Sequence, residues 1–176
     1  MANFVYGMNL SLDGFVDHQA FAPDDVLFRH WIDQIGSLTA GIYGRHVYQL
    51  MQYWEIDQPG WSPLEQAFAQ AWRRLPKWVV SGTLDSVGPN ATLISSGVEE
   101  AIRAIKSRHS GDIDISGTIL ADHLTRLGLI DEYRLYLHPV VLGQGKPFFA
   151  GPRPRLRLAA SDRIGDDVIR LTYLPT

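Results

Sequence analysis

Short apolar stretches with the spacing of β-strands alternate with stretches of helical spacing along most of the chain. Residues 113–124, IDISGTILADHL, show the switch within one segment: apolar residues alternate, the chain breaks at Ser116-Gly117, and a helical pattern begins at once. This succession of strand and helix occurs four or five times and is followed by a β-rich tail. It predicts an α/β fold with a mostly parallel sheet and an antiparallel C-terminal edge. The predicted strands are 3–10, 38–44, 77–81, 91–95, 113–116, the start of 131–143 and two in 155–175, and the predicted helices are 24–35, 45–54, 62–75, 97–108 and 118–124.

Local signals mark several of the expected boundaries. Asp24 or Asp25 is placed to cap the first helix, and Ser62 with Glu65 three positions later is a capping-box pattern around Pro63. The tail turns at 165–167, where a glycine and two aspartates separate two strands.

The bulk properties exclude several classes of protein. We expect one domain, residues 1–176, because single cores usually fill chains of about 100–200 residues. The net charge of −3, with no Lys/Arg block, gives no footprint for nucleic acid. Cysteine is absent, which excludes thiolate metal sites and a zinc-deaminase signature; we expect no metal. No run approaches ~18 apolar residues and the N-terminus has no basic flank, so we expect a cytoplasmic protein without membrane contact.

The residues that follow the predicted strands are polar or glycine. In open α/β sheets ligands bind beyond the carboxyl ends of the strands, and helix N-termini there offer N–H groups to anions. Arg45 adds a charge-assisted fork, so a phosphorylated nucleotide is the economical ligand. Each glycine turn also has a purely geometric explanation, and neither a Rossmann fingerprint nor a P-loop is present. The turns are Asp13-Gly14, Gly44-Arg45-His46, Ser81-Gly82-Thr83, Ser95-Ser96-Gly97 and Ser116-Gly117-Thr118.

Taken in order, four motifs resemble one known group. They are SLDGFV, YGRHVYQLM, KWVVSGTL and SGTILADHLTRLGLIDEYRLYLHPVVLGQGKPFF, and the resemblance covers about Phe4 to Tyr173. The sequence is similar to the dihydrofolate-reductase-like superfamily, and within it to the C-terminal reductase domain of the bifunctional riboflavin-biosynthesis deaminase/reductase and its stand-alone relatives. The resemblance implies a three-layer fold with a mixed, mainly parallel sheet, helices on both faces, NADPH across the strand ends, and a homodimer.

The resemblance also implies site residues. Two positions depart from the family pattern: Ser116 stands where a Gly-Gly pair is common, and Val47 where a Thr or Ser is common. A preference for NADPH over NADH rests on the resemblance and on Arg45 or Lys77. The implied cofactor-binding residues are Gly44, Arg45 and His46 near the phosphates; Ser81, Gly82 and Thr83 near the adenosine 2′-phosphate; and Ser116, Gly117, Thr118, Ile119 and Leu120 at the pyrophosphate.

The substrate side is less defined by the sequence. Asp13 matches a position that the relatives share, close to where nicotinamide and substrate meet, and is the candidate catalytic residue; a turn-forming role before Gly14 explains it equally well. Arg29 and His30 are possible phosphate ligands or solvent-facing residues. The acids of the first helix favour a capping or solvated role, so a folate site is not supported. Arg153, Arg155 and Arg157 fit the wet face of a strand better than a phosphate site, and the tryptophans fit either a planar-substrate pocket or a subunit interface.

Three hypotheses follow. The first is an NADPH-dependent reductase that transfers a hydride to a small, heterocyclic, pterin- or pyrimidine-like substrate. The second is the riboflavin-pathway 5-amino-6-ribosylaminouracil phosphate reductase itself. The third is a non-catalytic nucleotide-binding homologue, which Val47 and Ser116 favour.

Overall fold

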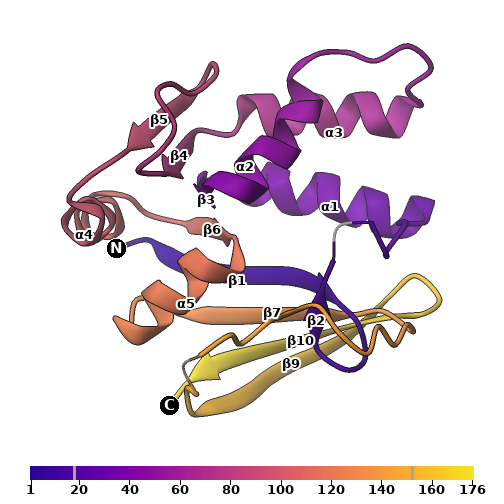
Figure 1. Ribbon diagram of the computed structural model, residues 1–176. Coiled ribbons are helices and arrows are strands. Elements are labelled where there is room, and N and C mark those ends of the chain that lie inside the picture. Colours follow the sequence, from indigo (N-terminus) through magenta and orange to yellow (C-terminus); the bar gives the residue numbers. More distant parts are fainter. Residues whose placement is uncertain (18, 152) are drawn as a thin grey trace.

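A single mixed sheet forms the centre of the molecule (Figure 1). The computed structural model describes residues 1–17, 19–151 and 153–176. The main path of the sheet runs β5-β4-β3-β6-β1-β7-β10-β9, with a short β2–β8 pair attached to β1. The strands from β5 to β7 along this path are parallel, and β10 and β9 are antiparallel, as predicted. The strands are β1 (Asn3–Leu10), β2 (Phe15–Val16), β3 (Ala40–Gly44), β4 (Lys77–Val80), β5 (Ala91–Ile94), β6 (Asp112–Ser116), β7 (Glu132–Leu137), β8 (Lys146–Pro147), β9 (Leu156–Ile164) and β10 (Val168–Pro175).

Helices cover both faces of the sheet and make a three-layer arrangement (Figure 1). On one face, side chains of β1, β3 and β6 pack against α4 and α5. On the other face, Tyr43 and Val79 pack against Phe68 and Trp72 of α3, with α1 alongside. This second face is called the α1 face below. The helices are α1 (Asp25–Ser37), α2 (Arg45–Met51), η1 (Gln52–Glu55), α3 (Pro63–Arg74), α4 (Val98–Arg108) and α5 (Thr118–Arg126).

The local helix signals are confirmed. Asp24 is the N-cap of α1, and its carboxylate accepts a hydrogen bond from the N–H of Leu27 at 2.7 Å. Ser62 and Glu65 form both bonds of the predicted capping box at the start of α3. Such caps depend only on neighbours within one turn, which is why they can be predicted from sequence.

Three details differ from the sequence prediction. The helix predicted over 45–54 ends at Met51 and continues as the 3₁₀ turn η1. The two-residue strands β2 and β8 were not predicted, because a pair of residues carries no periodicity. The strand β9 begins at Leu156, so Arg153 and Arg155 precede the strand on whose wet face they were expected.

The order of the strands positions the site. Because β4, β3, β6 and β1 are neighbours and parallel, their carboxyl ends lie at the same edge of the sheet. The turns after these strands therefore lie close together, although up to 105 residues separate Ser11 from Ser116 in the sequence.

Candidate functional site

The turns after β3 and β6 contact each other through two glycines. A Cβ atom built on Gly117 would lie 3.6 Å from the backbone nitrogen of Gly44 and 3.7 Å from its Cα. A Cβ built on Gly44 would lie 3.7 Å from the carbonyl oxygen of Ser116. Two predicted phosphate turns are thus packed backbone against backbone, with no side chain between them.

Gly117 has a backbone conformation that other residues rarely adopt. Its φ is 121° and its ψ is 129°, and it lies immediately before the first residue of α5. The buried Val47 packs beside it, with Cγ2 3.6 Å from the position a Cβ would take. Val47, a departure from the family pattern, therefore supports the glycine turn by packing.

The turn after β4 joins this pair through Arg45. The guanidinium Nη1 of Arg45 donates to the hydroxyl of Thr83 at 2.8 Å. The buried Ser81 hydroxyl accepts from the N–H groups of Thr83 and Leu84, which closes the turn. Ser81 has a local structural role, whereas Gly82 and Thr83 are exposed, as are Arg45 and His46.

The first turn of α5 supplies backbone donors. The first intrahelical bond runs from the N–H of Ala121 to the carbonyl of Gly117, so the N–H groups of Thr118, Ile119 and Leu120 have no partner within the helix. The Leu120 side chain belongs to the core, and that of Ile119 is 84% exposed. These residues can offer their backbone to an anion, and only Thr118 adds a hydroxyl.

The predicted turn after β5 stays apart from these three. Ser95, Ser96 and Gly97 follow β5, which is the edge strand beyond β4. Among the described residues, no hydrogen bond links this turn to those after β3, β4 or β6. Gly97 is in the left-handed conformation and starts α4.

Asp13 ties two loops together at the end of β1. Its carboxylate accepts hydrogen bonds from the Ser11 hydroxyl at 2.5 Å and from the N–H groups of Leu142 and Gly143 at 3.1 and 2.7 Å. The bond from Ser11, aided by those N–H groups, lowers the pKa of Asp13 below its usual value. The carboxylate therefore stays ionised and holds the loop 142–143 against β1, while its side chain is exposed.

Sequence reasoning missed a second aspartate, Asp114. It lies on the central strand β6, in register with Gly41 of β3 and Val5 of β1. Its side chain is partly buried on the α1 face, and its carboxylate Oδ2 accepts from the Ser116 hydroxyl at 2.5 Å. Burial raises the pKa of Asp114 to about 6, although Ser116 and Arg134 act in the opposite direction. The alternation in DIDIS, with isoleucines on the other face, is the sequence signal that could have found it.

Two histidines on the α1 face each lie within hydrogen-bond distance of a polar side chain of β1 or β7. The His138 imidazole is within 2.9 Å of the Asn9 side-chain oxygen and stacks on Phe21 with ring centroids 4.6 Å apart. On α1, His30 lies within 3.2 Å of the Tyr136 hydroxyl, so it is not simply solvent-facing. Desolvation lowers the pKa of both imidazoles, which favours neutral rings.

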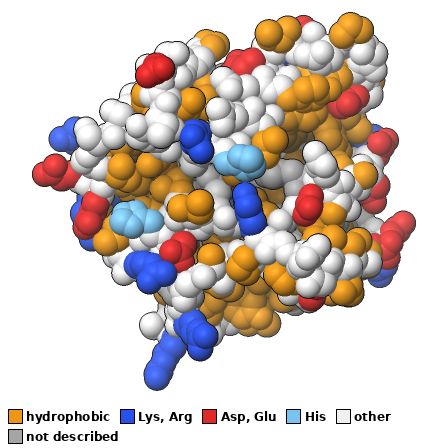
Figure 2. All heavy atoms as spheres, viewed as in Figure 1, with side chains coloured by type: hydrophobic (Ala, Val, Ile, Leu, Met, Phe, Trp, Pro, Cys, Tyr) orange, Lys and Arg blue, Asp and Glu red, His pale blue; other side chains and the backbone are white. Residues whose placement is uncertain are grey.

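Figure 2 looks onto the side where α2, β6 and α5 meet, and Lys, Arg and His side chains lie near its centre between apolar areas.

Within the described ranges, no group of three or more His, Cys, Asp or Glu residues is arranged to hold a metal ion. Across those residues, no helix has the length and apolar character needed to span a membrane.

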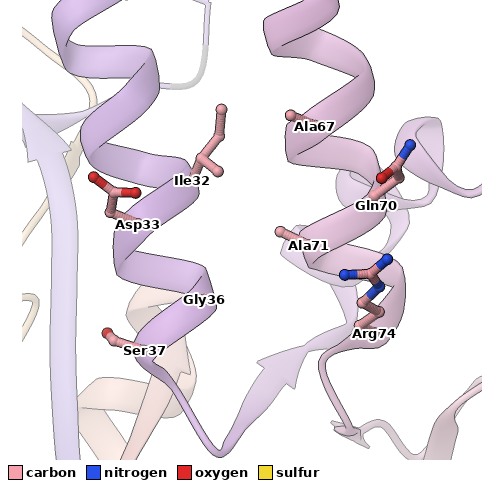
Figure 3. A pocket seen from close by; sticks show the side chains of 8 residues that line it. All are labelled: Ile32, Asp33, Gly36, Ser37, Ala67, Gln70, Ala71 and Arg74. Atoms are coloured by element: carbon pink, nitrogen blue, oxygen red, sulfur yellow. The ribbon is translucent and has the colours of Figure 1, made fainter.

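A cavity lies elsewhere, between the C-terminal halves of α1 and α3 (Figure 3). Its volume is about 600 Å³. Ile32, Ala67 and Ala71 point into it, whereas Asp33 points to the other side of α1 (Figure 3). Both helix halves lead into the amino ends of strands, so this cavity is at the opposite end of the sheet from the turns.

The sequence comparisons identify the family. Residues 5–170 match the family described as the RibD C-terminal domain. The chain belongs to this family. Its members are NAD(P)H-dependent reductase domains. A relative from Bacillus subtilis (strain 168), the uncharacterized protein YyaP, is 28% identical over 179 residues, covering 96% of this chain and 93% of YyaP.

Solved structures agree with the fold assignment. A putative riboflavin biosynthesis protein from Shewanella sp. PV-4 superposes with a TM-score of 0.73 at 20% identity, covering 100% of this chain and 99% of that one. Dihydrofolate reductase from Enterococcus faecalis, complexed with NADP(H) and RAB-propyl, has a TM-score of 0.67 at 13% identity, with 99% and 96% covered. The predicted dihydrofolate-reductase-like fold is therefore confirmed.

Proposed function

We propose that this protein is an NADPH-dependent reductase that transfers a hydride to a small heterocyclic substrate of pterin or pyrimidine type. The observation that carries the proposal is the meeting of three turns at one sheet edge, with Gly44 against Gly117 and Arg45 bonded to Thr83. One edge thus offers bare backbone, helix-start N–H groups and a guanidinium, which suit an extended anionic ligand.

The residues present fit a dinucleotide phosphate. A side chain at Gly117 would occupy the space beside the Gly44 nitrogen, so the bare turn leaves room for a close approach. In this proposal the N–H groups of Thr118 and Ile119 bind the pyrophosphate, and Arg45 with Thr83 binds the 2′-phosphate end. When bound, the cofactor supplies the hydride.

Asp13 belongs to the proposal as a residue near the reaction centre. Its three accepted hydrogen bonds and lowered pKa make it a poor proton donor. They support a positioning role, in which Asp13 fixes the loop 142–143 beside the end of β1. Its replacement should change substrate turnover more than NADPH affinity.

The first experiment is a titration with NADPH and, separately, NADH, followed by ligand and tryptophan fluorescence. NADPH should bind more tightly than NADH, and Arg45→Ala should weaken NADPH roughly tenfold through the lost charge-assisted bond while changing NADH little. Equal affinities in the unchanged protein, together with no effect of Arg45→Ala, would contradict the assignment of Arg45.

Gly117→Asp tests the turn itself. The aspartate brings a disfavoured φ, a side chain at the turn where the cofactor would approach, and a charge of the same sign as the cofactor, so NADPH binding should be lost. The matched control is Gly36→Asp on α1, an exposed glycine where an added Cβ would have no other atom within 4 Å. Unchanged NADPH affinity in a folded Gly117→Asp protein would overturn the site.

A further inference from the structure

Asp114 occupies a central place on the α1 face that none of the predicted cofactor turns uses. The strand β6 lies between β3 and β1, yet the Asp114 side chain keeps part of its surface exposed. A residue in the middle of a sheet stays accessible only where the covering layer does not close over it. The acid therefore keeps some contact with solvent on the α1 face, two residues before Ser116.

One oxygen of the Asp114 carboxylate, Oδ2, already accepts a hydrogen bond. The hydroxyl of Ser116 donates to Oδ2, and among the described residues no donor lies within hydrogen-bond distance of Oδ1. Oδ1 is also not fully buried, so it keeps some contact with solvent. The acid is thus oriented by Ser116 and retains an oxygen with free acceptor sites, the arrangement that binds a donor from a ligand.

Small and aromatic residues surround this carboxylate. Gly41 lies opposite on β3, with the ring of Tyr43 over it, and Gly7 on β1 has the ring of Tyr136 3.6 Å from the position of a Cβ. Trp31 of α1 packs on Tyr136 with ring centroids 4.4 Å apart. Flat apolar walls beside one polar acceptor suit a planar ring that presents its N–H edge.

The two arginines that β7 and β10 place on this face are already paired with acids. Arg134 donates to Glu132 at 2.5 Å and to Asp112 at 3.2 Å, and Arg170 donates to Asp162 at 2.9 Å. A phosphate group on this face would have to compete with the carboxylates for these arginines. Among the described residues, both Arg134 on β7 and Arg170 on β10 are paired in this way.

We infer that the substrate is an unphosphorylated planar heterocycle that presents two adjacent N–H donors to the carboxylate of Asp114. The inference rests on the proposed reductase function and narrows its substrate class. It disfavours a phosphoribosyl substrate. Asp114 acts here as a specificity-determining residue that contacts the substrate.

The test uses two fluorescent probes that differ only at one edge. The 2-amino-4-oxopteridine ring presents two adjacent donors, whereas 2,4-dioxopteridine presents a donor beside an acceptor. The unchanged protein, titrated with and without saturating NADPH, should bind the amino probe roughly tenfold more tightly. Asp114→Asn should remove that preference, because an amide offers one donor and one acceptor and so matches the dioxo edge.

Asp112→Asn is the matched control. Asp112 lies on the same strand and face as Asp114, but its carboxylate already pairs with Arg134. Asp112→Asn should leave the preference for the amino probe unchanged. An Asp114→Asn protein that keeps the preference, or an Asp112→Asn protein that loses it equally, would overturn the inference.

Phosphate exclusion is measured in the same titration. A large excess of ribose 5-phosphate should not displace the amino probe from the NADPH-saturated protein. Displacement would overturn the inference that the substrate is unphosphorylated. Failure of the reductase proposal has a different signature. There NADPH does not bind, while an Asp114-dependent preference for the amino probe persists and supports the site.

Discussion

Asp13 lies beyond the carboxyl end of β1, whereas Asp114 lies within β6 in register with Val5 and Gly41, and their surroundings are opposite. Asp13 is exposed, accepts three hydrogen bonds and has a lowered pKa. Asp114 is partly buried, accepts one side-chain bond and has a pKa raised to about 6. The motif SLDGF draws attention to the first, yet that carboxylate is committed to holding a loop. The second, hidden in a strand, is the one with capacity for a ligand.

The difference concerns what each acid does for the fold. Asp13 is stabilising as a carboxylate, because the fold supplies donors to it. Asp114 as a carboxylate is partly desolvated with few donors, which disfavours the folded protein at neutral pH. A residue that opposes stability locally, and has no evident compensating structural role, is a candidate for function.

The largest expected effect comes from replacing Asp114 with asparagine. The folded pKa of about 6 lies above the ordinary value of 3.8, so the folded state binds more protons between those values. The free energy of unfolding should therefore fall as pH rises from about 4 to about 6, by about 3 kcal/mol from this group, and stay level above. Asp114→Asn should lose that component and be more stable than the unchanged protein at neutral pH.

Urea unfolding of both proteins at several pH values measures this difference. The difference between the two proteins isolates Asp114 from the other titrating groups. Asp112→Asn serves as the comparison. Because the carboxylate of Asp112 pairs with Arg134, its replacement should not stabilise the protein at neutral pH. An Asp114→Asn protein that is less stable than the unchanged one at neutral pH would remove the contrast between the two acids.

A smaller effect is expected at Asp13. Asp13→Ala removes the acceptor for the N–H groups of Leu142 and Gly143, so hydrogen exchange at these two amides should become roughly tenfold faster. Asp17→Ala is the control, because within the part of the chain that the structure describes Asp17 accepts bonds from the nearby N–H groups of Gln19 and Ala20 and from no distant loop. Unaltered exchange at both loop amides would mean that Asp13 does not hold the loop.

The features predicted correctly from sequence are those decided by neighbours in the chain. The caps at Asp24 and Ser62 and the turn at 165–167 each depend on a few consecutive residues. The fold followed from the succession of strand and helix together with the motif order. The cofactor assignments to Gly44, Thr83 and Gly117 stay predictions, but the structure shows that the turns containing these residues lie together.

The features missed are those decided by partners distant in sequence. That Gly44 packs against Gly117 depends on β3 pairing with β6, which the sequence pattern leaves open. The pairing of Phe15 with Pro147 joins segments more than a hundred residues apart. Asp114 was missed for the same reason: its strand was recognised, but how far the side chain is covered depends on the helices that pack on the α1 face.

The smallest effect distinguishes how each acid is held by its serine. In both cases a serine hydroxyl two residues away donates to the carboxylate, Ser11 to Asp13 and Ser116 to Asp114, and lowers its pKa. Asp13 keeps two backbone donors when Ser11 is replaced, whereas Asp114 loses the one side-chain donor that the described residues give it. Ser116→Ala should therefore raise the pKa of Asp114 more than Ser11→Ala raises that of Asp13. Carboxyl carbon shifts followed by NMR across a pH titration measure both, and equal shifts would show that backbone donors do not distinguish the two sites.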